Sequence, residues 1–178
     1  PVYELLGGRV HEKLRTYTYL YPRDEAVFTE NEPHVYSDPY LAAQAAVEYV
    51  TQGFTAIKFD PAGLYSVFDP RQPSLEELER SELFCRLIRE AVGSKADLLF
   101  GTHGQFTPSG AIRLARRLEA YDPLWFEEPT PPERPEEMAK VARKTSIPIA
   151  TGERLTTKYE FSRVLETGAA SILQPALG

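Results

Sequence analysis

Residues 124–129 read LWFEEP, so that three bulky apolar residues run directly into two carboxylates and a proline. A short apolar run between Pro123 and Pro129 is typical of a buried strand. Side chains that follow such a strand in an α/β protein lie at the sheet edge where ligands bind. Glu127 is therefore a candidate site residue. The alternative interpretation is that Glu127 and Glu128 only begin a polar loop.

The composition is that of a globular protein, with 178 residues of which 42% are hydrophobic and 26% are charged. This length supports one sizeable core and is short for two domains. The net charge of −6, with acidic and basic residues interspersed, provides no basic surface, so we expect no nucleic-acid partner. No apolar run approaches the roughly 20 residues of a membrane span and no signal-peptide pattern is present, so we expect no membrane partner.

The chain contains one cysteine, Cys85, which lies in an apolar helical pattern and excludes an internal disulfide. We expect a buried thiol and a reducing, cytoplasmic setting. His11 and His34 lie in polar surroundings and are expected at the surface.

Strand and helix patterns alternate along the chain. Residues 1–8 are typical of a helix that ends at Gly7-Gly8, and a long loop over residues 21–33, of the kind that often has a function, follows the first strand. Ser74 and Glu77 form a capping-box pattern. The predicted strands are 15–20, 54–59, 98–100, 124–126, 147–150 and 171–173, and the predicted helices that follow them are 39–50, 75–92, 107–118, 136–144 and 156–167.

This alternation predicts an α/β fold with a parallel sheet and right-handed crossovers. Gly101, Glu127 and Glu153 follow three successive predicted strands at equal intervals of 26 residues (127 − 101 and 153 − 127). Such an interval is typical of a repeated βα unit in a TIM-type (β/α) barrel. A doubly wound sheet would more often show a glycine-rich phosphate turn, which Gly7-Gly8 is not, so we prefer the barrel.

Glu127 and Glu153 are candidate metal ligands. The carboxyl ends of neighbouring barrel strands face the same mouth, so these two carboxylates are expected to converge. Carboxylate oxygens suit Mg²⁺, which also retains waters or takes substrate oxygens. The alternative for Glu153 is a loop carboxylate in a salt bridge.

His103 and Lys58 are candidate catalytic residues. His103 lies between glycines directly after the third predicted strand, where an imidazole can exchange protons near neutral pH, although a histidine held in a tight turn is the alternative. Lys58 is a charged residue in an apolar strand, and burying it requires a partner. Asp60 or a substrate carboxylate are the candidate partners.

Four motifs at successive strand ends resemble the mandelate racemase and muconate lactonizing branch of the enolase superfamily, most closely its galactonate-type sugar-acid dehydratases. They are Lys58-Phe59-Asp60, Thr102-His103-Gly104, Phe126-Glu127-Glu128-Pro129 and Thr151-Gly152-Glu153-Arg154. The resemblance spans nearly the whole chain. It implies a modified barrel beside an amino-terminal capping domain, and an enzyme in which Mg²⁺ holds a carboxylate substrate while a base removes the α-proton.

The resemblance assigns a role to each candidate. It implies that Glu127 and Glu153 are metal ligands, that His103 is the acid that expels a hydroxyl, and that Lys58 acts near the substrate carboxylate or in proton transfer. The position of the third ligand, normally Asp or Glu, is Gly101. Ala176 stands where relatives often have Asp or Asn.

We therefore expect a Mg²⁺-dependent lyase that dehydrates an acid sugar, with a racemase or cycloisomerase as the nearest alternative and a catalytically silent or truncated member as the third. The resemblance implies that residues 1–178 are a partial barrel domain of about six strands, without the capping domain and the last barrel strands. Six strands cannot close such a barrel, so both edges of the sheet require a partner. A homo-oligomer is the expected assembly.

Overall fold

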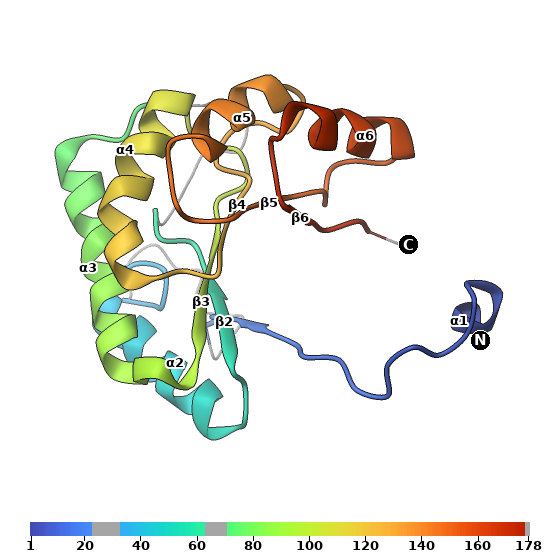
Figure 1. Cartoon of the computed structure of the whole chain (residues 1–178). Coiled ribbons are helices and arrows are strands. Elements are labelled where there is room, and N and C mark those ends of the chain that lie inside the picture. Colours follow the sequence, from blue (N-terminus) through green and yellow to red (C-terminus); the bar gives the residue numbers. More distant parts are fainter. Residues whose placement is uncertain (23–32, 63–70, 177–178) are drawn as a thin grey trace.

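A computed structural model describes residues 1–22, 33–62 and 71–176 (Figure 1). Within these residues the chain forms one sheet of six parallel strands in the order β1-β2-β3-β4-β5-β6. The strands are β1 (Thr18–Tyr19), β2 (Ala56–Phe59), β3 (Asp97–Gly101), β4 (Trp125–Glu127), β5 (Ile149–Thr151) and β6 (Ile172–Leu173). The α-helices are α1 (Val2–Leu5), α2 (Pro39–Thr51), α3 (Leu75–Val92), α4 (Pro108–Leu118), α5 (Pro135–Ala142) and α6 (Lys158–Thr167), and two 3₁₀ turns, η2 (Gly93–Lys95) and η3 (Glu119–Tyr121), follow α3 and α4.

The strand order confirms the predicted (β/α) barrel architecture. Each strand pairs with the next one along the chain, and the order never reverses as it does in a doubly wound sheet. Right-handed crossovers then place every connecting helix on the same side of the sheet. Figure 1 shows α2 to α6 arranged along that side, outside the strands.

Alternating residues divide the sheet into two faces. Phe59, Phe100 and Phe126 occupy one register row, in which their rings meet edge to face at 5.4 and 6.4 Å between centroids. This row belongs to the hydrophobic core that the sheet shares with the helices. Since side chains alternate along a strand, Lys58 and Glu127 project from the opposite, helix-free face.

Local signals explain where the helices begin. Asp38 accepts hydrogen bonds from the first turn of α2, and Pro39 takes the first helical position. Ser74 and Glu77 form the predicted capping box at the start of α3. A second capping box joins Thr157 to the third residue of α6, so this helix begins at Lys158, two residues later than predicted.

The first strand is shorter than predicted, because only Thr18 and Tyr19 pair with β2. Helix α1 ends before Gly7 and Gly8, whose positive φ angles stop it as expected. Cys85 is buried, as predicted. Most of the predicted loop over residues 21–33 lies outside the described residues. In the described part of the chain, no helix has the length and apolarity needed to cross a membrane.

The row of phenylalanines provides a test of the core. Phe100 is fully buried between Phe59 and Phe126, so Phe100→Ala should lower the free energy of unfolding by about 3–5 kcal/mol. Leu165→Ala, on an exposed part of α6, should change it by less than about 0.5 kcal/mol. Urea unfolding followed by circular dichroism measures both. Equal losses would contradict this description of the core.

Candidate active site

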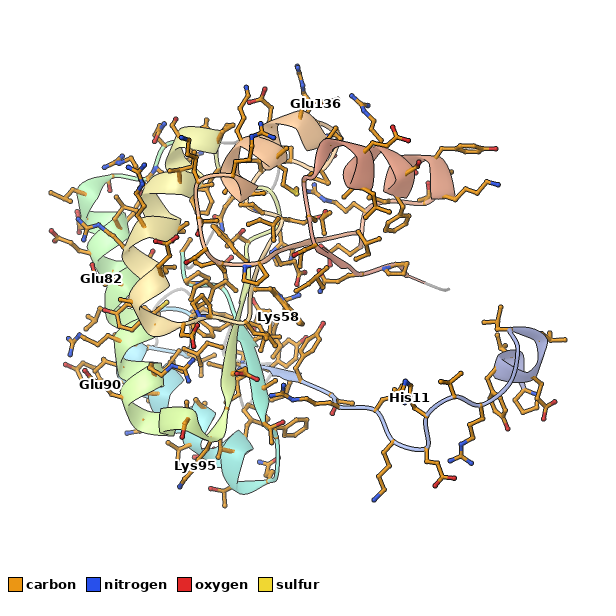
Figure 2. The ribbon with its side chains drawn as sticks, in the orientation of Figure 1. His11, Lys58, Glu82, Glu90, Lys95 and Glu136 are labelled. Carbon is orange, nitrogen blue, oxygen red and sulfur yellow. The ribbon has the colours of Figure 1, made fainter. Side chains whose placement is uncertain are left out.

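A buried ion pair between Lys58 and Glu127 lies at the centre of the helix-free face. The Lys58 ammonium donates to Glu127 Oε1 at 2.6 Å, and the two residues are only 7% and 2% exposed. Figure 2 shows Lys58 on the side of the strands that faces away from α3 and α4. Glu127, rather than Asp60, is therefore the charged partner that a buried Lys58 finds within the chain.

The ion pair crosses an intervening strand. Lys58 belongs to β2 and Glu127 to β4, and Gly101 on β3 lies directly beside Glu127 in the register. A Cβ atom at position 101 would lie 2.5 Å from Lys58 Cε, closer than real side chains approach. The missing side chain of Gly101 therefore opens the path along which Lys58 reaches Glu127.

The second carboxylate oxygen of Glu127 also has partners. Its Oε2 atom accepts hydrogen bonds from Trp125 Nε1 at 3.2 Å and from Gln174 Nε2 at 3.0 Å. Both oxygens of a buried carboxylate are thus satisfied, which offsets the cost of burying its charge.

Aromatic rings surround the ammonium group. Lys58 Nζ lies 5.7 Å from the ring centroid of Tyr17 and 6.0 Å from that of Tyr19, both within the range of a cation–π interaction. The Tyr17 ring packs edge to face on Trp125. The residues around Glu127 therefore form an environment that favours a cation.

His103 lies in a turn that is tied to the end of β4. Its φ angle is +49°, and Gly104 follows at +71°. Thr102 Oγ1 donates to the carbonyl of Glu127, and the Gly104 amide donates to the carbonyl of Glu128 at 2.7 Å. These bonds hold His103 beside the same strand end as Glu127.

The surroundings of His103 favour its neutral form. Burial lowers the pKa of His103 below its ordinary value of 6.5. Lys58 and Arg154 lower the pKa further, whereas the Glu153 and Glu127 carboxylates raise it. His103 therefore lies within the electrostatic influence of all the other candidate site residues.

Glu128 belongs to a second ion pair, in which the carboxylate is buried and the arginine is partly exposed. Its Oε2 atom accepts from Arg154 Nε at 3.0 Å, and the Glu128 side chain is fully buried. Arg154 also donates to the His103 carbonyl at 3.4 Å. Burial raises the pKa of Glu128, while Arg154 opposes that shift. This pair joins the end of β5 to the turn that carries His103.

Glu153 differs from Glu127 in its surroundings. It follows β5 and Gly152, is exposed, and makes no hydrogen bond or ion pair within the described residues. Its carboxylate is close enough to His103 to raise the pKa of the imidazole. The structure thus places all four predicted site residues at consecutive strand ends, where Lys58 and Glu127 form a salt bridge.

Comparison with known proteins identifies the family of this architecture. Residues 41–178 match the family model described as enolase C-terminal domain-like. The chain belongs to this family. The match confirms the resemblance that the four strand-end motifs indicate.

Proteins of known name and structure are similar to nearly the whole chain. A D-xylonate dehydratase of Haloferax volcanii is 35% identical over 99% of this chain and 41% of its own length, and a D-gluconate dehydratase of Thermoproteus tenax is 35% identical over 98% and 32%. A crystal structure of a candidate mandelate racemase/muconate lactonizing enzyme from Labrenzia alexandrii is 73% identical, with a TM-score of 0.90, over 98% of this chain and 43% of that one. The chain therefore spans less than half the length of these relatives.

The side chains as arranged do not fit the magnesium ion that the family resemblance implies. Both oxygens of Glu127 are occupied, and Gly101 supplies no ligand. In residues 1–22, 33–62 and 71–176, no three His, Cys, Asp or Glu side chains group closely enough to hold a metal ion. An octahedral ion such as Mg²⁺ needs oxygens that are free to coordinate it.

Trp125 and Gln174 also belong to the site, although the sequence alone did not predict them. Trp125 is two positions before Glu127, so strand alternation places both on one face. Gln174 directly follows β6 and contacts Glu127, whereas the family resemblance singled out Ala176, two residues later. The contact from Gln174 spans 47 positions in sequence, and no local pattern indicates it.

The buried ion pair predicts an unequal response to loss of two lysines. Lys58→Met leaves the Glu127 charge buried without its cation and should lower the free energy of unfolding by about 3–5 kcal/mol. Lys140→Met breaks an exposed Lys–Glu pair of the same 2.6 Å length and should cost less than about 1 kcal/mol. Urea unfolding compares the two variants. A similar small loss in both would show that the Lys58 pair is not buried in solution.

The electrostatics of His103 predict its titration. Glu153 raises the pKa of His103, so Glu153→Gln should lower that pKa further, whereas Glu166→Gln at an exposed position of α6 should not. Histidine NMR signals followed against pH report the value. Because the folded-state pKa lies below 6.5, the stabilisation from neutral His103 is present above pH 6.5 and is lost as the pH falls through the folded-state pKa. An increase of the pKa in Glu153→Gln would contradict the prediction.

Proposed function

We propose that this chain is the barrel part of a lyase that dehydrates an acid sugar. The observation that carries the proposal is the placement of Lys58, His103 and Glu127 at the ends of neighbouring strands β2, β3 and β4, in a family whose named relatives include sugar-acid dehydratases. An acid sugar carries the two groups that the reaction needs. They are a carboxylate at C1, next to the α-carbon C2, and a hydroxyl on C3.

Lys58 is the proposed partner of the substrate carboxylate. An ammonium group has three N–H donors, and Glu127 takes one of them at 2.6 Å. Within the described residues the remaining donors make no other hydrogen bond, so they are available to a carboxylate that enters from the helix-free face. A positive charge at that point also stabilises the enolate that forms when the α-proton leaves.

His103 is the proposed proton carrier. Its lowered pKa keeps the imidazole neutral near pH 7, so it is able to accept the α-proton from C2 of the substrate. The electron pair of that C–H bond moves into the carboxylate as an enolate and then forms the C2–C3 double bond while the C3–O bond breaks. The imidazolium gives its proton to the departing hydroxyl, which leaves as water. The enol that remains tautomerises to a 2-keto-3-deoxy acid.

Gln174 supports recognition of the substrate hydroxyls. Its amide NH₂ is used by Glu127, while its Oε1 atom is buried without a hydrogen-bond partner in the described part of the chain. An unpaired buried acceptor carries a free-energy cost that a substrate hydroxyl could relieve.

Mg²⁺ was predicted from the sequence as the cofactor, and in the family resemblance it stabilises the enolate charge. Because the arrangement of Glu127 and Gly101 does not fit a magnesium ion, no step of the proposed reaction uses it. Racemisation or cycloisomerisation is the second candidate, since both begin with the same α-proton and the 73% identical structure belongs to the mandelate racemase/muconate lactonizing group.

The proposal predicts a specific histidine dependence. The protein should convert xylonate, gluconate or galactonate to a 2-keto-3-deoxy acid, and His103→Asn should lower kcat by about 10²–10⁴-fold. His11→Asn, in the amino-terminal segment away from the sheet, is the matched control and should retain full activity (Figure 2). Keto-acid formation is read by semicarbazone absorbance. Deuterium exchange at C2 without formation of a keto acid would favour the racemase or cycloisomerase. The absence of both deuterium exchange and keto acid would indicate a catalytically silent protein.

A further inference from the structure

The ammonium of Lys58 is the cation that contacts Glu127 in the structure. It donates to Oε1 of that carboxylate at 2.6 Å, and the rings of Tyr17 and Tyr19 lie 5.7 and 6.0 Å from it. The remaining oxygen of Glu127 is held by Trp125 and Gln174. Glu127 is therefore already neutralised by a cation that belongs to the chain.

Gly101 is the residue that permits this arrangement. A Cβ atom there would lie 2.5 Å from Lys58 Cε and 3.4 Å from Nζ. Any side chain at position 101 and the present conformation of Lys58 therefore exclude each other. A carboxylate on β3 and an ammonium that crosses β3 are alternatives for the same space.

We infer that Lys58 is a built-in counter-ion of Glu127 which excludes divalent cations from this strand end, and that Gly101 and Lys58 act as a coupled pair. Two cations beside one buried carboxylate repel each other strongly in a site of low dielectric constant. A divalent cation binds Glu127 only when the Lys58 side chain leaves. The inference concerns cation binding alone and does not depend on the proposed reaction.

A four-variant cycle with Mn²⁺ as the probe tests the coupling. Free Mn²⁺ is measured by electron paramagnetic resonance during titration of the wild type, Lys58→Met, Gly101→Asp and the double variant. Lys58→Met should bind Mn²⁺ at least about tenfold more tightly than the wild type. Gly101→Asp alone should raise the Mn²⁺ affinity by less than about threefold, because the new carboxylate pairs with Lys58. The double variant has carboxylates on β3 and β4 and no lysine, so its Mn²⁺ affinity should rise by about a hundredfold or more. This gain in binding free energy should exceed the sum of the gains in the two single variants.

Two control variants show whether a change in Mn²⁺ affinity comes only from the loss of a positive charge or from poor folding. Lys140→Met removes the same charge and breaks a Lys–Glu pair of equal length on the surface, so its Mn²⁺ affinity should match the wild type. Lys58→Gln keeps a polar side chain in case Lys58→Met is poorly folded. In both Lys58 variants, Mn²⁺ should raise the thermal midpoint by more than in the wild type, because a ligand that binds the folded state stabilises it.

Two results would overturn the inference. Equal Mn²⁺ affinity of the wild type and both Lys58 variants would show that the lysine does not compete. A failure of the folded Lys58 variants and the double variant to bind Mn²⁺ would show that no cation position exists at Glu127. Both readouts need no substrate, so they are independent of whether the protein dehydrates an acid sugar.

Discussion

The ion pair between Lys58 and Glu127 organises the helix-free face of this barrel segment. Each charge is costly to bury alone, and each is buried here because the other lies 2.6 Å away. The pair joins β2 to β4 across β3, so it also depends on the absence of a side chain at Gly101. Gly101 thus allows the ammonium of Lys58 to reach the carboxylate of Glu127. Trp125 and Gln174 donate hydrogen bonds to the other carboxylate oxygen of Glu127.

This polar arrangement is possible because the other face of the same strands is fully apolar. Phe59, Phe100 and Phe126 pack in one row against the core that the helices cover, and their neighbours in sequence project the other way. A parallel sheet in chain order keeps all its helices on one side. The carboxyl ends of the strands therefore carry His103, Glu127 and Arg154 at positions that the core holds rigidly, which is the property a reactive site needs.

Much of the fold could be predicted from local patterns. The capping box at Ser74 and the proline at position 39 each act within a few residues, and each was found where expected. The apolar strands were also found, although the first one is shorter than predicted. The start of the fifth strand was predicted less accurately, at Ile147, whereas β5 begins at Ile149. Pro148 has no amide hydrogen to donate to a neighbouring strand, although its carbonyl accepts a hydrogen bond from the Phe126 amide. The positions of Lys58, His103, Glu127 and Glu153 at strand ends also followed from periodicity. Their partners did not, since the Lys58–Glu127 contact joins residues 69 positions apart.

The same long-range contact explains why the predicted magnesium ligands and the observed contacts of these carboxylates differ. Residue types alone suggest two magnesium ligands, Glu127 and Glu153, with a gap at Gly101. In three dimensions the gap is filled by Lys58, one carboxylate is saturated, and the other is exposed. The space left by the missing side chain on β3 is thus filled by the long side chain of Lys58 from the preceding strand, β2. Gly101 therefore does more than leave out a ligand at this strand end, because the space that it leaves admits the cation of Lys58 to Glu127.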